Sequence, residues 1–171
     1  MKKPEPSDYN PYYGKYIALV RDENPLEALR SGREMMLGLL ASVSEADALA
    51  KHAPYTWSIK EVVGHLLDCE RIFAYRTLRI ARNDSTLLAG FEENDYVRIA
   101  GFDRRSLTNL ASEFDTVRRS TLSLLDSLDE EAWERRGMAN GSAISVRALA
   151  FILAGHERHH ATILKARLGL S

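Results

Sequence analysis

The stretch that decides the fold runs from Ser58 to Asn83 and reads SIKEVVGHLLDCERIFAYRTLRIARN. Its first four residues form a capping box, in which Ser58 and Glu61 bind free backbone amides at the start of a helix. Apolar side chains then recur at intervals of three and four as far as Ile80, which is the period of an amphipathic α-helix. Because no proline follows Thr56, nothing interrupts a helix of this length. The stretch is predicted to be one long helix with a continuous buried face.

Similar amphipathic patterns lie on both sides of this stretch. Helices are predicted over residues 25–43, 106–128 and 145–168, the first of them starting with a capping asparagine and a proline at Asn24-Pro25. Four amphipathic helices of this length, with one long connection, are typical of a four-helix bundle. The fold class expected is therefore all-α.

The remaining segments read as connections. Residues 84–105 are too many for a tight helix hairpin, so we expect a long crossover between the second and third helices, with a turn of helix around 95–100. Residues 1–24 read as an irregular N-terminal arm that packs on the body through its tyrosines. Residues 129–133 are predicted to form a short helical turn, and Arg135–Ser142 a loop.

Composition limits the class of protein. The chain has 171 residues and a net charge of −1, which fits one domain, residues 1–171, and argues against a dedicated nucleic-acid binder. Its single cysteine, Cys69, cannot form an internal disulfide. The longest apolar stretch is far shorter than the roughly 20 residues of a membrane span, and the N-terminus lacks the pattern of a signal peptide. We therefore expect a cytoplasmic protein that binds neither nucleic acid nor membrane.

Three histidines interrupt the apolar faces of two predicted helices. His156 and His160 are four residues apart, so they lie one turn apart on one helix face, the spacing with which a helix offers two imidazoles to one metal ion. His65 lies within the apolar stripe of the helix that follows Ser58. Three neutral imidazoles leave open positions on a divalent ion, which suits catalysis. The competing interpretation is that the histidines are unrelated, with His160 in solvent.

Two neighbours of these histidines offer alternatives. Cys69 could be a fourth ligand or a redox-sensitive thiol, although a small buried apolar residue is the favoured interpretation. Glu157 and His160 form half of a di-iron motif. Because no matching half exists elsewhere in the sequence, a di-iron site is not favoured and Glu157 is expected to face solvent.

The charged residues of the second helix also have two interpretations. Arg76 lies on the apolar face, so it or Arg79 could anchor an anionic substrate or thiol cofactor. An internal ion pair of Arg76 with the segment 92–95 is favoured, since a buried arginine usually has a carboxylate partner. The role of Glu70, five residues after His65, is left open. No phosphate loop, nucleophile elbow or Cys-x-x-Cys pair is present.

Several runs of the sequence, taken together, resemble one family. The run Trp57–Arg76 resembles the second helix of the DinB-like (YfiT-like) superfamily, and AGHERHH at Ala154–His160 is similar to its last helix. PYYGKY at Pro11–Tyr16 and GFEENDY at Gly90–Tyr96 are similar to further segments of that group. The resemblance covers nearly the whole chain and rests on the combination of these motifs.

The resemblance implies a four-helix bundle in which His65, His156 and His160 bind a divalent metal ion, with nickel, zinc and iron as candidates. It also implies a small-molecule substrate and a homodimer. Some relatives are transferases or isomerases that use a low-molecular-weight thiol such as mycothiol or bacillithiol, and others are classed as metal-dependent hydrolases. The function expected is therefore metal-dependent S-transfer or hydrolysis.

The alternative is a non-catalytic bundle that holds a structural metal, or none, and acts by association with other proteins. Closed coordination, with Cys69 or a carboxylate as the fourth ligand, would favour it. Metal ligation also requires neutral imidazole, whose unperturbed pKa is about 6.5. From the sequence alone, the stability that metal adds is expected to shrink as pH falls through about 6.5.

Overall fold

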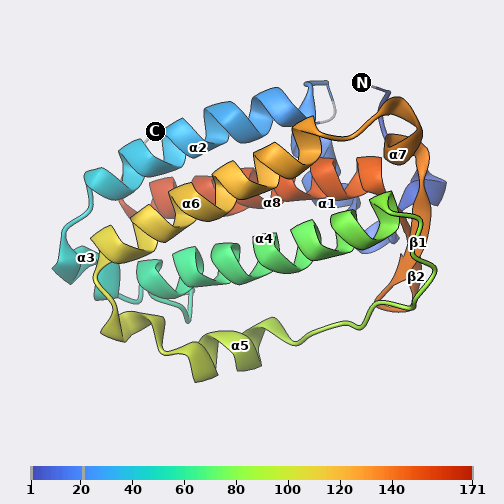
Figure 1. Ribbon diagram of the computed structural model, residues 1–171. Coiled ribbons are helices and arrows are strands. Elements are labelled where there is room, and N and C mark those ends of the chain that lie inside the picture. The colour runs from blue at the N-terminus through green and yellow to red at the C-terminus, as the bar shows by residue number, and fades with distance from the viewer. Residues whose placement is uncertain (1, 21, 171) are drawn as a thin grey trace.

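The computed structural model describes residues 2–20 and 22–170. Within them, four long helices run side by side along the molecule (Figure 1), namely α2 (Pro25–Ala41), α4 (Ile59–Ala81), α6 (Leu107–Asp126) and α8 (Val146–Arg167). Each begins where the sequence predicted, behind a capping side chain that accepts a hydrogen bond from the first turn. The predicted all-α four-helix bundle is confirmed.

The order of the helices around the bundle places α4 opposite α2. Both α2 and α4 pack against α6 and α8, so α2 and α4 lie diagonally across the bundle. Figure 1 shows that α4 and α6 run in the same direction. This is possible because the predicted crossover returns along the outside of the bundle through α5 (Glu93–Ala100) and a 3-10 turn, Phe102–Arg104. The expected turn α7 (Glu130–Glu134) is present, and a further short helix, α3 (Glu45–Leu49), follows α2.

The N-terminal arm is more regular than we expected. Two 3-10 turns, Pro6–Asp8 and Pro11–Tyr13, lead into a seven-residue helix, α1 (Gly14–Val20). A helix this short is not stable alone, so it depends on packing against the bundle. Gly155 of α8 permits that packing, since a Cβ atom there would lie 2.0 Å from the carbonyl oxygen of Tyr16. The arm thereby lies directly against the part of α8 that precedes His156.

A two-stranded hairpin replaces the loop predicted over Arg135–Ser142. Strand β1 (Arg136–Ala139) pairs antiparallel with β2 (Ser142–Ser145). Asn140 and Gly141 join them with φ values of 50° and 71°, as a two-residue type I′ turn requires. This Asn-Gly pair was the signal in the sequence. The strands themselves are too short to show an alternating pattern, which is why the segment read as a loop.

A layer of buried polar side chains crosses the middle of the bundle. Among the described residues, one apolar cluster fills the hairpin end and a second fills the end near α3. Residues of other kinds lie near the boundary between the two clusters. These are Gly32 on α2, His65 and Glu70 on α4, Arg118 on α6, and His156, Glu157 and the part-buried His160 on α8. No helix in the described part of the chain has the length and hydropathy that a membrane span requires.

Candidate metal centre

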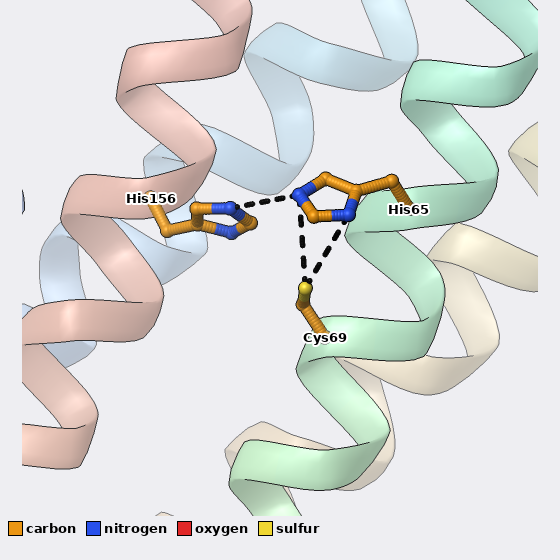
Figure 2. A group of neighbouring side chains, drawn as sticks. All are labelled: His65, Cys69 and His156. Carbon is orange, nitrogen blue, oxygen red and sulfur yellow. Dashed lines mark hydrogen bonds between the residues drawn. The ribbon is translucent and has the colours of Figure 1, made fainter. Parts of the chain in front are cut away.

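The three predicted histidines converge in this polar layer. Nε2 of His156 lies 3.1 Å from Nε2 of His65 and 3.2 Å from Nε2 of His160. The rings of His65 and His160 are 5.0 Å apart between centroids. Figure 2 shows His65 of α4 and His156 of α8 pointing toward one another, with Cys69 one turn along α4. The spacing read from the sequence therefore brings three imidazoles from two helices to one point.

Hydrogen bonds among the imidazoles cannot account for this arrangement. A ring nitrogen presents either one N–H or one lone pair in the plane of the ring, yet Nε2 of His156 faces two other Nε2 atoms. A single cation bound by all three lone pairs satisfies them together. Ligands about 2.0–2.1 Å from one ion are separated by 3.1–3.2 Å when they subtend an angle of about 100°. The spacings around His156 therefore fit ligands of one divalent ion, and the donors that all lie within 4.8 Å of one another are those of His65, Cys69 and His156, without His160.

Burial holds these histidines in the neutral form that ligates metal. It lowers the pKa of His65 to about 4 and that of His160 to about 3. For His156, burial lowers the pKa well below its usual value, and the neighbouring imidazoles lower it further. At neutral pH all three side chains are therefore free to donate a lone pair without first losing a proton.

The lowered pKa values correct the expected pH dependence of the metal's contribution. Folded-state pKa values below the unfolded value of about 6.5 mean that stability is present above pH 6.5 and is lost as pH falls through it. That loss is common to metal-free and metal-loaded protein, because it arises from protonation of the unfolded chain. The gap between their melting temperatures depends only on protonation of the folded site. The buried histidines therefore move the expected shrinkage of this gap to a lower pH than 6.5.

We predict that both melting temperatures fall below about pH 6.5 while the gap between them persists to about pH 5. It should close only toward pH 4, where protons begin to compete for His65. Thermal melts of dialysed metal-free protein and of protein with excess metal, across this range, measure the gap. A gap of zero at neutral pH, or one that has already halved at about pH 6.5, would contradict the assignment of these buried histidines.

Cys69 lies beside the histidines. Its Sγ atom is 3.6 Å from Nδ1 and 3.7 Å from Nε2 of His65, and it belongs with His65 and His156 to a group whose donor atoms lie within 4.8 Å of one another (Figure 2). The expected burial of this residue is confirmed. Burial also raises the pKa of the Cys69 thiol, so at neutral pH it is protonated and is not a nucleophile. It is a candidate fourth donor, and the sequence had left this role open.

A cavity of about 410 Å³ leads to the histidines. The N-terminal arm, α4, the start of α5 and the hairpin form its walls, so it depends on the two elements that we had expected to be irregular. His65, Cys69 and His156 lie in its wall. Its other lining residues include Tyr13, Tyr16, Phe73, Arg76, Phe91, Glu92, Glu93 and Asn140. The volume is that of a small-molecule site.

Aromatic rings enclose the imidazoles on their other sides. The ring of Trp57 lies 4.9 Å from that of His65, and the ring of Tyr16 lies 5.2 Å from that of His156 and 5.4 Å from that of His159. Trp57 and Tyr16 were not predicted as part of the site. For Tyr16, the clustering of tyrosines in the N-terminal arm was the available signal in the sequence.

Glu157 is buried, and the expectation that it faces solvent was wrong. It is 3% exposed and forms an ion pair with Arg118, whose Nε and Nη2 also donate hydrogen bonds to the carboxylate of Glu70, each 2.8 Å long. Nη1 of Arg118 donates to the Leu29 carbonyl at 3.0 Å. Gly32 provides the space for Glu157, because a Cβ there would lie 2.0 Å from Oε1. Arg118 thus joins all four helices directly beside the histidines.

The charge of Arg118 obscures the inner face of α6 in the sequence. Val117 and Leu124 are apolar and are not buried, whereas Arg118 and Leu125, one residue further on, are buried. A paired arginine on the inner face does not read as core in the sequence.

Arg76 has no carboxylate partner among the residues that the structure describes. Its Nη2 donates to the Ala89 carbonyl at 2.7 Å, and the favoured ion pair with the segment 92–95 does not form. Arg79 forms an ion pair with Asp84. Of the two interpretations of Arg76, an internal ion pair is therefore wrong, and an anchor for an anionic ligand remains.

Comparison with known proteins gives a family match. Residues 28–164 match the model of the DinB superfamily. A comparison with curated proteins gives no match.

Solved structures share the fold at low sequence identity. YfiT from Bacillus subtilis, described as a probable metal-dependent hydrolase with an unusual four-helix bundle topology, is 15% identical, with a TM-score of 0.77 and 99% of this chain and 95% of that one covered. A mycothiol-dependent maleylpyruvate isomerase is 14% identical, with a TM-score of 0.70 over 82% of this chain and 59% of that one. The DinB-like protein YjoA from Bacillus subtilis is 23% identical, with a TM-score of 0.61, 86% and 92% being covered.

Proposed function

This chain belongs to the DinB superfamily, and from that membership and its site we propose that it is a metal-dependent enzyme acting on a small molecule. His65, His156 and His160 would hold one divalent ion, with nickel, zinc and iron as candidates. The observation that carries the proposal is the approach of the Nε2 atoms of His65 and His160 to within 3.1 and 3.2 Å of that of His156, beside a cavity of about 410 Å³ whose wall includes His65 and His156.

The chemistry follows from the ion and from the residues around it. A divalent ion on three imidazoles supplies Lewis acidity, which favours the deprotonated form of a water molecule or thiol. Trp57 and Tyr16 shield the imidazoles from bulk water. Glu93 lines the cavity, and its charge contributes to raising the pKa of the Cys69 thiol, although burial is the larger cause. The Glu93 carboxylate is the proposed acceptor of the released proton, because it lines the same cavity.

Hydrolysis is the first candidate reaction, with water as the nucleophile. The likeness to the probable hydrolase YfiT, which covers nearly all of both chains, supports it.

Thiol transfer is the second candidate reaction. The sulfur of Cys69 at 3.6–3.7 Å from the nitrogens of His65 shows that a sulfur atom is accommodated beside the imidazoles, and one similar structure is a mycothiol-dependent enzyme. In that version the thiol comes from a second, low-molecular-weight molecule. Association into a homodimer and a cytoplasmic location stay predictions.

The experiment asks whether the site has an open position, and it needs no known substrate. Protein loaded with Co²⁺ is titrated with azide and, separately, with 2-mercaptoethanol, while its visible spectrum is recorded. An enzyme with three protein ligands binds both, and only the thiol adds a sulfur-to-cobalt charge-transfer band. Two outcomes favour the non-catalytic alternative: a spectrum that responds to neither probe, and a charge-transfer band already present that Cys69→Ser removes.

A further inference from the structure

One buried arginine differs from the others in its partners. Among the described residues, Arg76, Arg118 and Arg147 are 3% exposed or less. Arg118 is bound by two carboxylates, and Arg147 pairs with Glu134. Arg76 has no such partner, although a buried charge without a counter-charge is strongly destabilising. A protein keeps such a charge where something outside the chain neutralises it.

The surroundings of Arg76 hold the guanidinium in place and leave its charge free. Its Cζ atom lies 5.7 Å from the ring centroid of Phe73 and 5.9 Å from that of Phe91, so the two rings pack near it. One N–H donates to the carbonyl of Ala89, at 2.7 Å. Guanidinium has several other N–H groups in a planar fork. The Tyr13 hydroxyl is a further hydrogen-bond partner of the guanidinium. No carboxylate of the described chain forms an ion pair with it.

The same guanidinium lines the cavity that leads to the histidines. Phe73 lies near both, with its ring centroid 5.7 Å from Cζ of Arg76 and 6.3 Å from the ring of His156. We infer that Arg76 binds the carboxylate of the small molecule on which the histidine site acts. The inference rests on the proposed function in one respect, that the cavity is where the substrate of that site binds.

The lining defines the class of ligand more closely. A planar fork binds a carboxylate through two parallel hydrogen bonds. Glu92 and Glu93 lie in the same wall and disfavour a second negative charge. Tyr13, Phe73 and Phe91 offer an apolar surface to the body of the ligand. The ligand is therefore a monocarboxylate with an apolar or aromatic body.

The probes are benzoate and its neutral counterpart benzamide, titrated by calorimetry into metal-loaded and metal-free protein. Wild-type protein should bind benzoate more tightly than benzamide in both forms. Arg76→Gln should lower benzoate affinity about tenfold or more, to the level of benzamide, and Arg76→Lys should lie between. Arg79→Gln is the matched control, because Arg79 lies one turn further along α4 and pairs with Asp84. It should bind benzoate as wild type does.

Stability separates a binding role from a structural one. Because Arg76→Gln removes an uncompensated buried charge, its melting temperature should equal or exceed that of wild type. A marked loss of stability or failure to fold would show that Arg76 is structural and would overturn the inference. So would benzoate binding that ignores Arg76→Gln or disappears when metal is removed, and so would tighter binding of phthalate or inorganic phosphate than of benzoate.

The inference and the proposed function fail separately. Metal content of Arg76→Gln should equal that of wild type. If no variant binds metal while benzoate binding still depends on Arg76, the proposed function fails and the carboxylate site stands. If metal binds and the affinity for benzoate is the same with and without Arg76, the carboxylate site fails and the proposed function stands.

Discussion

Replacing any one of His65, His156 and His160 by alanine is expected to remove stoichiometric divalent metal from the protein. Each variant leaves only two imidazoles, and three ligands contain no spare. Affinity should fall by about 100-fold or more, since the loss of residues that merely support metal ligands already costs 10–100-fold. Elemental analysis of each variant after gel filtration, with folding checked by circular dichroism, makes the measurement.

Two histidines outside the cluster serve as controls. His52→Ala removes a half-buried imidazole outside the cluster. His159→Ala removes the residue next to His160 in the sequence, and the ring of His159 packs on Tyr16. Both variants should retain metal. If all three cluster variants retain stoichiometric metal instead, the ligand assignment is wrong. If Cys69→Ser loses metal as completely as they do, the site is closed by four protein ligands and the non-catalytic alternative is the better account.

Arg118→Met is expected to produce the largest loss of stability. The substitution leaves the carboxylates of Glu70 and Glu157 buried against one another without a counter-charge. Removing one partner of a buried ion pair typically costs about 3–5 kcal/mol, which in a chain of this size lowers the melting temperature by roughly 10 °C. Burial already raises the pKa of the Glu157 carboxyl, so the loss should shrink as pH falls and this group takes up a proton.

The adjacent residue provides the control for this variant. Arg119 is 71% exposed and pairs with Asp115 on the same helix, so Arg119→Met should change the unfolding free energy by less than about 0.5 kcal/mol. Chemical denaturation of both variants measures the two values. Equal losses would show that the pairing of Arg118 is not what holds the helices together at this layer.

The histidines and the ion-pair group of Glu70, Arg118 and Glu157 depend on one another through the helices that carry them. His156 and Glu157 are consecutive on α8, so they point to different neighbours, one toward α4 and the other toward Arg118 of α6. Because Arg118 also binds Glu70 of α4, it ties α4 and α8 together at the level of the histidines. We expect Arg118→Met to weaken metal binding modestly, without removing a ligand.

The parts of the fold and site that follow from local pattern could be predicted from the sequence. The capping box at Ser58 and the apolar period after it identified α4, and the interval between His156 and His160 placed two ligands on one face. The direction of His65 followed from its place in an apolar stripe. All three predictions depend on residues a few positions apart, where helix geometry determines what lies together.

The parts that depend on distant contacts could not be predicted. Glu70 is 48 residues from Arg118 in the sequence, and nothing in either segment shows that they meet. Glu157 pairs with the same arginine, and because that contact could not be foreseen, Glu157 was wrongly assigned to solvent. Helix α1 is stabilised by packing on α8, and its sequence alone is too short to reveal it. The missing partner of Arg76 is a property of the folded cavity, since a carboxylate-rich segment was available nearby in the sequence.

The most direct test of the central claim is a crystal structure of protein purified without affinity-tag histidines and loaded with nickel or zinc, with anomalous diffraction recorded at the absorption edge of the metal. We expect one anomalous peak per chain, about 2.0–2.2 Å from Nε2 of each of His65, His156 and His160, with at least one coordination position not filled by the protein. A map without a peak among these three atoms, or with the metal bound by other side chains, would contradict it.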